Sequence, residues 1–115
     1  MRVLVCGGRN YSNFNYVQKI LNQWHQGCNF SLLIAGGQTG ADTLAETWAY
    51  INKVPTLIIK AEWKKFGKAA GNLRNTRMLV DGQPIIVIAF PGNTGTADMI
   101  MQAKAAHIAV KDYRK

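Results

Sequence analysis

The chain has 115 residues, of which 48% are hydrophobic and 17% are charged. This composition indicates one folded globular domain over residues 1–115 and excludes disordered and fibrous proteins. Fourteen Lys and Arg against six Asp and Glu give a formal net charge of +8, which favours an anionic partner such as a nucleotide or a nucleic acid. Because no apolar run approaches the roughly 20 residues that span a membrane, we expect a cytoplasmic protein with no membrane partner.

The cysteines and histidines do not indicate a metal site. Cys6 and Cys28 lie in or beside apolar runs with no ligand spacing, so we expect two buried thiols, no disulfide and no metal. His25 and His107 have no partner nearby in the sequence for acid–base work, and we expect both to be structural.

Five short apolar segments are expected to form strands. They cover residues 2–6, 31–35, 56–59, 85–89 and, more weakly, 107–110. The runs are nearly continuous in Val, Ile and Leu, which is typical of parallel strands that are covered on both faces.

Segments with helical periodicity lie between these strands. Apolar residues recur at helical spacing from Val17 to Trp24 and again from Ala41 to Trp48. Two further helices are expected over 69–80 and 96–105, the second capped by Thr96. The alternation predicts an α/β Rossmann-like fold, with a mostly parallel sheet of about five strands and helices on both faces.

Three glycine-containing turns follow predicted strands, at 7–10 (GGRN), 36–40 (GGQTG) and 91–96 (PGNTGT). Turns after parallel strands meet at the carboxyl edge of the sheet, where doubly wound folds bind ligands. Glycine lets backbone amides approach a phosphate, and helix N-termini add free N–H groups. We therefore predict a site for a phosphorylated ligand. Neither G-x-G-x-x-G nor G-x-x-x-x-G-K-[ST] is present, so a dinucleotide dehydrogenase, a P-loop ATPase and a resident cofactor are not expected.

These turns, taken with other short motifs, resemble a known family. The segments concerned are 7–9 (GGR), 36–42 (GGQTGAD), 61–63 (AEW), 70–75 (AGNLRN) and 90–96 (FPGNTGT). Together they resemble the small YspA/YpsA-related branch of the SLOG superfamily over nearly the whole chain. The resemblance implies a Rossmann-like fold and a nucleotide-type ligand. The superfamily includes Lonely Guy phosphoribohydrolases, the DNA-processing protein DprA and domains thought to sense ADP-ribose or NAD derivatives.

The chain departs from the Lonely Guy pattern P-G-G-x-G-T-x-x-E at two positions. Asn93 replaces the second glycine, and Met99 stands where the pattern has its catalytic glutamate. Asp98 is one residue early, which on a helix is a rotation of about 100°. The departure favours binding over hydrolysis, and it leaves Asp98 and Asp42 as the candidate carboxylates for a hydrolase.

Several side chains are candidates for contacting the ligand. Arg9 is placed to clamp a phosphate, Trp63 to stack on a base and Asp42 to accept hydrogen bonds from ribose hydroxyls. Arg74 and Asn75 match a segment that Lonely Guy proteins use near the phosphoribosyl group. The full set of expected ligand-binding residues is Gly7, Gly8, Arg9, Gly36, Gly37, Gln38, Thr39, Gly40, Asp42, Trp63, Arg74, Asn75, Pro91, Gly92, Asn93, Thr94, Gly95 and Thr96.

The expected function is binding of a nucleotide or nucleotide-derived ligand, of the ADP-ribose, NAD-derivative or nucleoside monophosphate class, by a sensor or sequestering protein. The alternatives are an N-glycosidic hydrolase and a DNA- or RNA-binding protein. Because related SLOG proteins commonly dimerise, we also expect a homodimer or a higher homo-oligomer.

Overall fold

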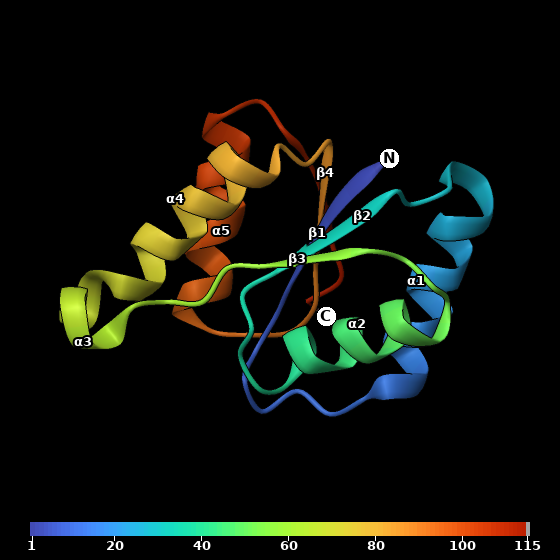
Figure 1. Cartoon of the computed structure of the whole chain (residues 1–115), viewed down its shortest axis with the longest axis horizontal. Helices are drawn as coiled ribbons and strands as arrows, with labels where there is room; N and C mark the ends of the chain where they lie inside the picture. Colours follow the sequence, from blue (N-terminus) through green and yellow to red (C-terminus); the bar gives the residue numbers. More distant parts are fainter. Residues whose placement is uncertain (115) are drawn as a thin grey trace.

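The structure is a computed structural model, and it describes residues 1–114 (Figure 1). Strands and helices alternate along the chain, as the sequence predicts. The elements are β1 (Arg2–Cys6), α1 (Phe14–Cys28), β2 (Leu32–Ala35), α2 (Ala41–Ile51), β3 (Thr56–Ile58), α3 (Trp63–Phe66), the 3₁₀ turn η1 (Gly67–Ala69), α4 (Ala70–Gly82), β4 (Ile86–Ala89), α5 (Thr94–Ala105) and β5 (Ala109–Asp112).

The five strands form a parallel sheet in the order β3-β2-β1-β4-β5. The chain first winds from β1 towards β3 and then returns to add β4 on the other side of β1. The strand order therefore reverses between β1 and β4, where Cys6 pairs with Ala89 at the carboxyl ends. In doubly wound sheets a ligand crevice forms at such a reversal.

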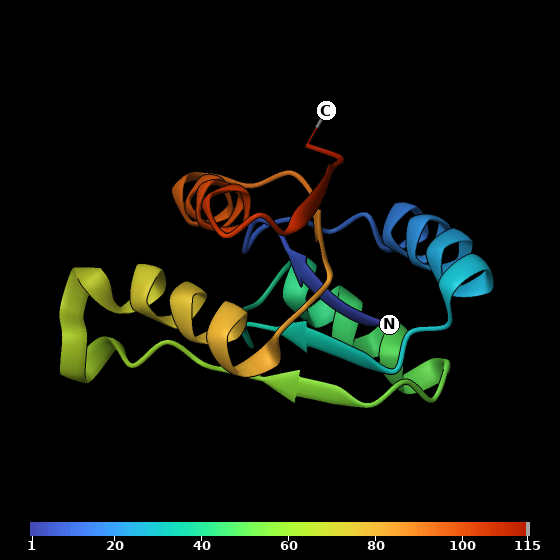
Figure 2. The ribbon, with the colours of Figure 1, turned by 90° about the horizontal axis from the view of Figure 1, so that it is seen from above.

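The two faces of the sheet carry separate apolar cores. In β1, Val3 and Val5 pack with the residues of α1 and α2, whereas Leu4 and Cys6 pack with those of α4 and α5. The alternation follows from the period of two in a strand, which sends successive side chains to opposite faces. Figures 1 and 2 show α1 and α2 on one side of the sheet and α4 and α5 on the other. The predicted Rossmann-like α/β fold is confirmed.

Several boundaries shift by one or two residues, and three differences from the prediction matter for the site or the sheet. The sequence reading did not include α3 and η1, which occupy the lysine-rich segment before α4. Helix α5 begins at Thr94, so Thr96 is a buried residue of its first turn and not its cap. The last strand begins at Ala109, because His107 has a φ of +60° and belongs to the turn.

One expectation about a single side chain also needs correction. Cys28 is exposed at the end of α1, whereas Cys6 is buried as expected. His25 is structural, as expected: its Nδ1 accepts the amide hydrogen bond of Phe30 at 2.9 Å and so closes the end of α1. Trp48, at 1% exposure, is a core residue of α2.

None of the helices within residues 1–114 has the length and apolar character needed to cross a membrane.

Candidate functional site

The three glycine turns meet at the carboxyl edge of the sheet and are joined by hydrogen bonds. The amide of Gly8 donates to the carbonyl of Pro91 at 2.7 Å, and the amide of Ala41 donates to the carbonyl of Gly8 at 3.0 Å. The Thr39 hydroxyl adds a bond to the carbonyl of Arg9 at 3.1 Å. The turn after β1 is therefore held between the turns after β2 and β4.

Two of the glycines are required by this close packing. A Cβ at Gly92 would lie 2.7 Å from the amide nitrogen of Gly8, and backbone cannot give way as a flexible side chain can. Gly40 has a φ of +82°, and a Cβ there would collide with the backbone of Gly8 and Arg9. These glycines shape the edge of the sheet by letting the turns touch one another.

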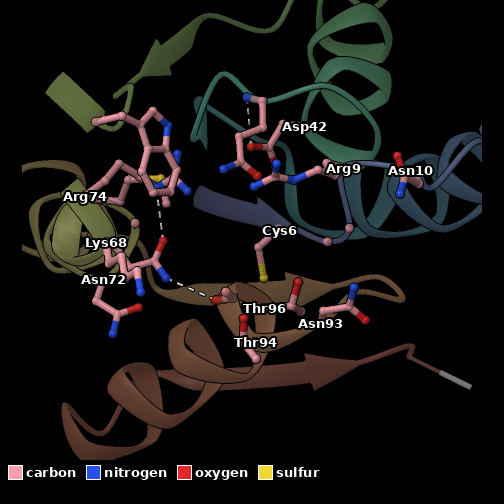
Figure 3. Close-up of a pocket in the computed structure, with 18 residues that line it drawn as sticks. Cys6, Arg9, Asn10, Asp42, Lys68, Asn72, Arg74, Asn93, Thr94 and Thr96 are labelled. Carbon is pink, nitrogen blue, oxygen red and sulfur yellow. Dashed lines mark hydrogen bonds between the residues drawn. The ribbon is translucent and has the colours of Figure 1, made fainter.

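A cavity of about 350 Å³ opens at this edge, beside the reversal between β1 and β4. Figure 3 shows Arg9 and Asp42 on one side of it, Arg74, Lys68 and Asn72 on another, and Thr94 and Thr96 at the bottom of the view. Its volume lies near the lower end of the range of about 300–1,000 Å³ found for small-molecule sites. The lining residues are Cys6, Gly7, Gly8, Arg9, Asn10, Gln38, Asp42, Trp63, Lys68, Gly71, Asn72, Arg74, Asn75, Met78, Asn93, Thr94, Gly95 and Thr96.

Arg74, from α4, is the buried cation of the cavity, with 7% of its surface exposed. Its Nη1 donates to the carbonyl of Gly36 at 2.8 Å, and its Nε donates to Oδ1 of Asn75 at 3.1 Å. Within residues 1–114, Nη2 of Arg74 makes no hydrogen bond. Every fully buried side-chain nitrogen in that range has a partner, so Nη2 is not fully buried. Nη2 is therefore accessible from the cavity. Burial lowers the pKa of Arg74, and the nearby Asp42 opposes that change.

Asp42, in the first turn of α2, is the buried carboxyl of the same cavity, at 5% exposure. Its Oδ2 accepts the amide hydrogen bond of Gln38 at 3.3 Å. Burial raises its pKa from 3.8 to about 6, against the lowering effects of that amide and of Arg74. Within residues 1–114, the ion pair that the structure forms joins Arg114 to Asp112. Asp42 and Arg74 are therefore buried without forming a direct ion pair. Each can therefore engage a ligand.

Asp98 does not line the cavity, and a hydrogen-bond network explains its position. Its Oδ2 accepts bonds from Nδ2 of Asn75 at 3.0 Å and from Nε2 of Gln102 at 2.7 Å. Asn75 Nδ2 also donates to the carbonyl of Gly95, which leaves Oδ1 of Asn75 to receive the bond from Arg74. Asp98 thus sets the orientation of the Asn75 amide and, through it, of Arg74. Met99, at the Lonely Guy glutamate position, is fully buried in the core beneath α5.

The first turn of α5 supplies the backbone part of the site. Asn93, Thr94, Gly95 and Thr96 line the cavity, and no acidic side chain occupies that turn. The first amides of a helix have no partners within it and carry a partial positive charge. They therefore add anion-binding capacity to the wall that faces Arg74.

Most of the residues expected to bind the ligand lie around the cavity, but some do not. Gly37 and Thr39 line a smaller neighbouring cavity. Gly36, Gly40, Pro91 and Gly92 line neither cavity, and Gly36 acts through its carbonyl, which holds Arg74. Sequence reasoning did not select six of the lining residues, namely Cys6, Asn10, Lys68, Gly71, Asn72 and Met78. Three of these residues lie on α4: Gly71, Asn72 and Met78. Gly71 and Met78 lie three and four residues from Arg74, which places them on the same helix face, and this spacing was the signal that could have identified them.

Trp63, the first residue of α3, is half exposed and lines the cavity together with Lys68. Lys60, Lys64 and Lys65 are exposed and do not line it. Burial raises the pKa of the Cys6 thiol, so this lining residue is a neutral thiol and not a reactive thiolate. No group of three or more His, Cys, Asp or Glu residues suited to a metal ion is found within residues 1–114.

The comparisons with known proteins agree with this architecture. A profile of the YspA, cpYpsA-related SLOG family matches residues 1–66, which carry the first two glycine turns, Asp42 and Trp63. The Gene 61 protein of Mycobacterium phage D29 is 32% identical over 121 residues, and the match covers 97% of this chain and 95% of that protein. No solved structure gives a significant match. The chain therefore belongs to the YspA, cpYpsA-related SLOG family.

Proposed function

We propose that this protein binds a nucleotide or a nucleotide-derived ligand in the cavity at the carboxyl edge of the sheet, as a sensor or a sequestering protein. The ligand is of the ADP-ribose, NAD-derivative or nucleoside monophosphate class. The observation that carries the proposal is Arg74, which is buried in the cavity wall with one guanidinium nitrogen left without a protein acceptor.

A buried guanidinium without a direct ion pair is stabilised by a ligand that places an anionic group against its free nitrogen. A phosphate group matches both the charge and the fork of donors of arginine. The first-turn amides of α5 and the side chain of Lys68 line the same cavity and add to the attraction for a phosphate.

The remaining lining residues suit the rest of a nucleotide. Asp42 offers carboxylate oxygens to ribose hydroxyls, as acidic residues do in other Rossmann-like sites. The exposed indole of Trp63 offers a face on which a base can stack.

The experiment that tests the proposal is calorimetric titration of the purified protein with AMP, ADP-ribose, adenosine and inorganic phosphate. We expect AMP to bind at least about tenfold more tightly than adenosine, since a charge-assisted contact contributes roughly 1.5–3 kcal/mol. AMP should also bind more tightly than phosphate alone, because Asp42 and Trp63 contact only the nucleoside. Equal binding of AMP and adenosine, or no saturable binding of either AMP or ADP-ribose, contradicts the proposal.

A second candidate is hydrolysis of an N-glycosidic bond, for which Asp42 is the favouring observation. A carboxyl with a pKa raised to about 6 lies in the range where one group can take up and release a proton near neutral pH. Incubation with AMP, NAD and ADP-ribose followed by chromatography tests this activity. Release of free base that disappears in Asp42→Asn supports the hydrolase, and full recovery of every compound rejects it.

Substituting Gly95 by valine is expected to weaken AMP binding about tenfold, or ~1.4 kcal/mol, without changing the far-ultraviolet circular dichroism spectrum. A Cβ at Gly95 would meet nothing within 4 Å, so a valine fits there without a clash. Because Gly95 lines the cavity at the start of α5, the added side chain occupies space in the cavity. Gly27, in α1, offers a matched control because a Cβ there also meets nothing within 4 Å and Gly27 does not line the cavity. Equal AMP affinities in Gly95→Val and Gly27→Val would mean that the α5 amides do not hold the phosphate.

A further inference from the structure

A second, smaller cavity adjoins the first. It has a volume of about 260 Å³ and is lined by Arg9, Gly37, Gln38, Thr39 and Trp63. Three of these residues, Arg9, Gln38 and Trp63, line the first cavity as well. The two cavities therefore share a boundary and lie along one continuous stretch of the surface.

Trp63 is the main apolar side chain at this boundary. Its side chain is 48% exposed although tryptophan is among the residues that gain most from burial. The indole edge lies against α4 at Gly71, where an added Cβ would be 3.4 Å from Cη2 of Trp63. An added Cβ would be at ordinary van der Waals distance, so the indole lies close to α4 and borders both cavities.

The charges around the second cavity also indicate an anionic occupant. Arg9 is exposed and common to both cavities, and the Lys60 side chain runs alongside Gly37, whose Cβ would lie 2.8 Å from Cγ of Lys60. The second cavity has no acidic lining residue within the described chain, whereas the first has Asp42. A negative group on the second-cavity side of this boundary therefore lies beside Arg9, whereas Asp42 lines the first cavity.

The geometry points to a ligand in two parts: a nucleoside 5′-diphosphate that carries a second group, with one part in the Arg74 cavity and the second group beyond Trp63 in the smaller cavity. This inference rests on the proposed function and selects, within it, the ADP-ribose class over the nucleoside monophosphates. Arg9 contacts the diphosphate where it crosses the boundary. The indole of Trp63, at the same boundary, keeps its contact with the base of the nucleoside.

The first test uses the unaltered protein. Calorimetric titrations with AMP, ADP and ADP-ribose are expected to give at least about tenfold tighter binding for ADP-ribose than for AMP, with ADP between them, because the added phosphate and ribose gain contacts in the second cavity.

The second test fills the smaller cavity alone. Thr39 lines only that cavity, so Thr39→Trp is expected to reduce ADP-ribose affinity about tenfold, to the level of AMP, and to change AMP affinity less than about threefold. Thr47→Trp is the matched control, since Thr47 is an exposed residue of α2 that lines neither cavity. Thr39→Ser, which keeps the hydroxyl that donates to the Arg9 carbonyl, separates filling of the cavity from loss of that hydrogen bond.

Each outcome has a defined meaning. Equal affinities for AMP and ADP-ribose in the unaltered protein overturn the two-part ligand and leave the proposed nucleotide site intact. Tighter ADP-ribose binding that Thr39→Trp does not reduce also overturns it, because the extra group then lies outside the second cavity. If no nucleotide binds at all, the proposed function fails and the two-part ligand fails with it.

Discussion

Replacing Arg74 by alanine is expected to weaken AMP binding by about ten- to a hundredfold, which corresponds to roughly 1.5–3 kcal/mol for a lost charge-assisted contact. Arg74 is 7% exposed and lines the cavity, so an interaction with a phosphate there is screened little by solvent. Arg74→Lys keeps the charge but loses the planar fork of donors, so its affinity for AMP should lie between those of the unaltered protein and of Arg74→Ala. Calorimetric titration of the three proteins measures the effect.

Controls separate a direct contact from the general positive field. Arg77, an exposed residue of α4 that does not line the cavity, is the matched control for loss of one cation from that helix. The double change Lys64→Gln and Lys65→Gln should leave AMP affinity within about threefold, because exposed charges outside a pocket act through a screened field. Circular dichroism checks that Arg74→Ala still folds without its bonds to Gly36 and Asn75.

The opposite ranking indicates nucleic-acid binding. If the lysine pair matters more than Arg74, the partner is an extended strand. In that case affinity for an oligonucleotide falls steeply with salt, with a slope that drops by about 0.7–0.9 for each phosphate contact removed. The titrations are therefore run at two salt concentrations.

The second large expected effect concerns stability and pH. Burial raises the pKa of Asp42 from 3.8 to about 6, so between these values the folded protein holds a proton that the unfolded chain has released. The contribution of Asp42 to the free energy of unfolding is therefore fully present below about pH 4 and is lost as pH rises through about 6. At roughly 1.4 kcal/mol for each tenfold change in acid dissociation constant, the loss is about 3 kcal/mol.

Asp42→Asn isolates this contribution. The amide cannot ionise, and its Oδ1 can still accept the Gln38 hydrogen bond. We expect the substitution to raise the free energy of unfolding by up to about 3 kcal/mol near pH 7.5 and to change it little near pH 4. Urea unfolding at the two pH values measures both. Asp81→Asn, at an exposed residue of α4, controls for removal of one negative charge from a basic protein. An equal effect of Asp42→Asn at both pH values would show that hydrogen bonding, and not ionisation, dominates at this position.

These two residues were assigned from the sequence for different reasons, and only the structure connects them. Asp42 was expected to contact ribose because it follows a glycine turn, and Arg74 to lie near a phosphate because its segment resembles that of Lonely Guy proteins. Neither reason indicated that both side chains flank Gly36, where a Cβ would lie 3.0 Å from Oδ2 of Asp42 and would collide with Arg74. That arrangement depends on how α4 docks on the sheet.

Local sequence patterns account for most of the fold. Strand β4, and β1 after Arg2, are apolar at every position because both faces of a parallel sheet are covered. This pattern can be recognised from the sequence of each strand alone. The stripe that includes Val17, Ile20 and Leu21 is equally local, since a helix repeats its buried face every three or four residues. The glycine turns follow the strands in the chain, so their meeting at one edge could be inferred from parallel order alone.

The details of the site depend on contacts between residues far apart in the chain, which no local pattern encodes. Asp98 was a candidate carboxylate in the sequence, but Asn75 and Gln102 bind it because α4 and α5 pack side by side, and it serves to position Arg74. Trp63 borders two cavities and lies against Gly71 of a later helix, a placement that depends on how α3 packs against α4. Periodicity thus decides which side of an element is buried, whereas the shape of the cavity and the partners of its charges arise only when the elements pack together.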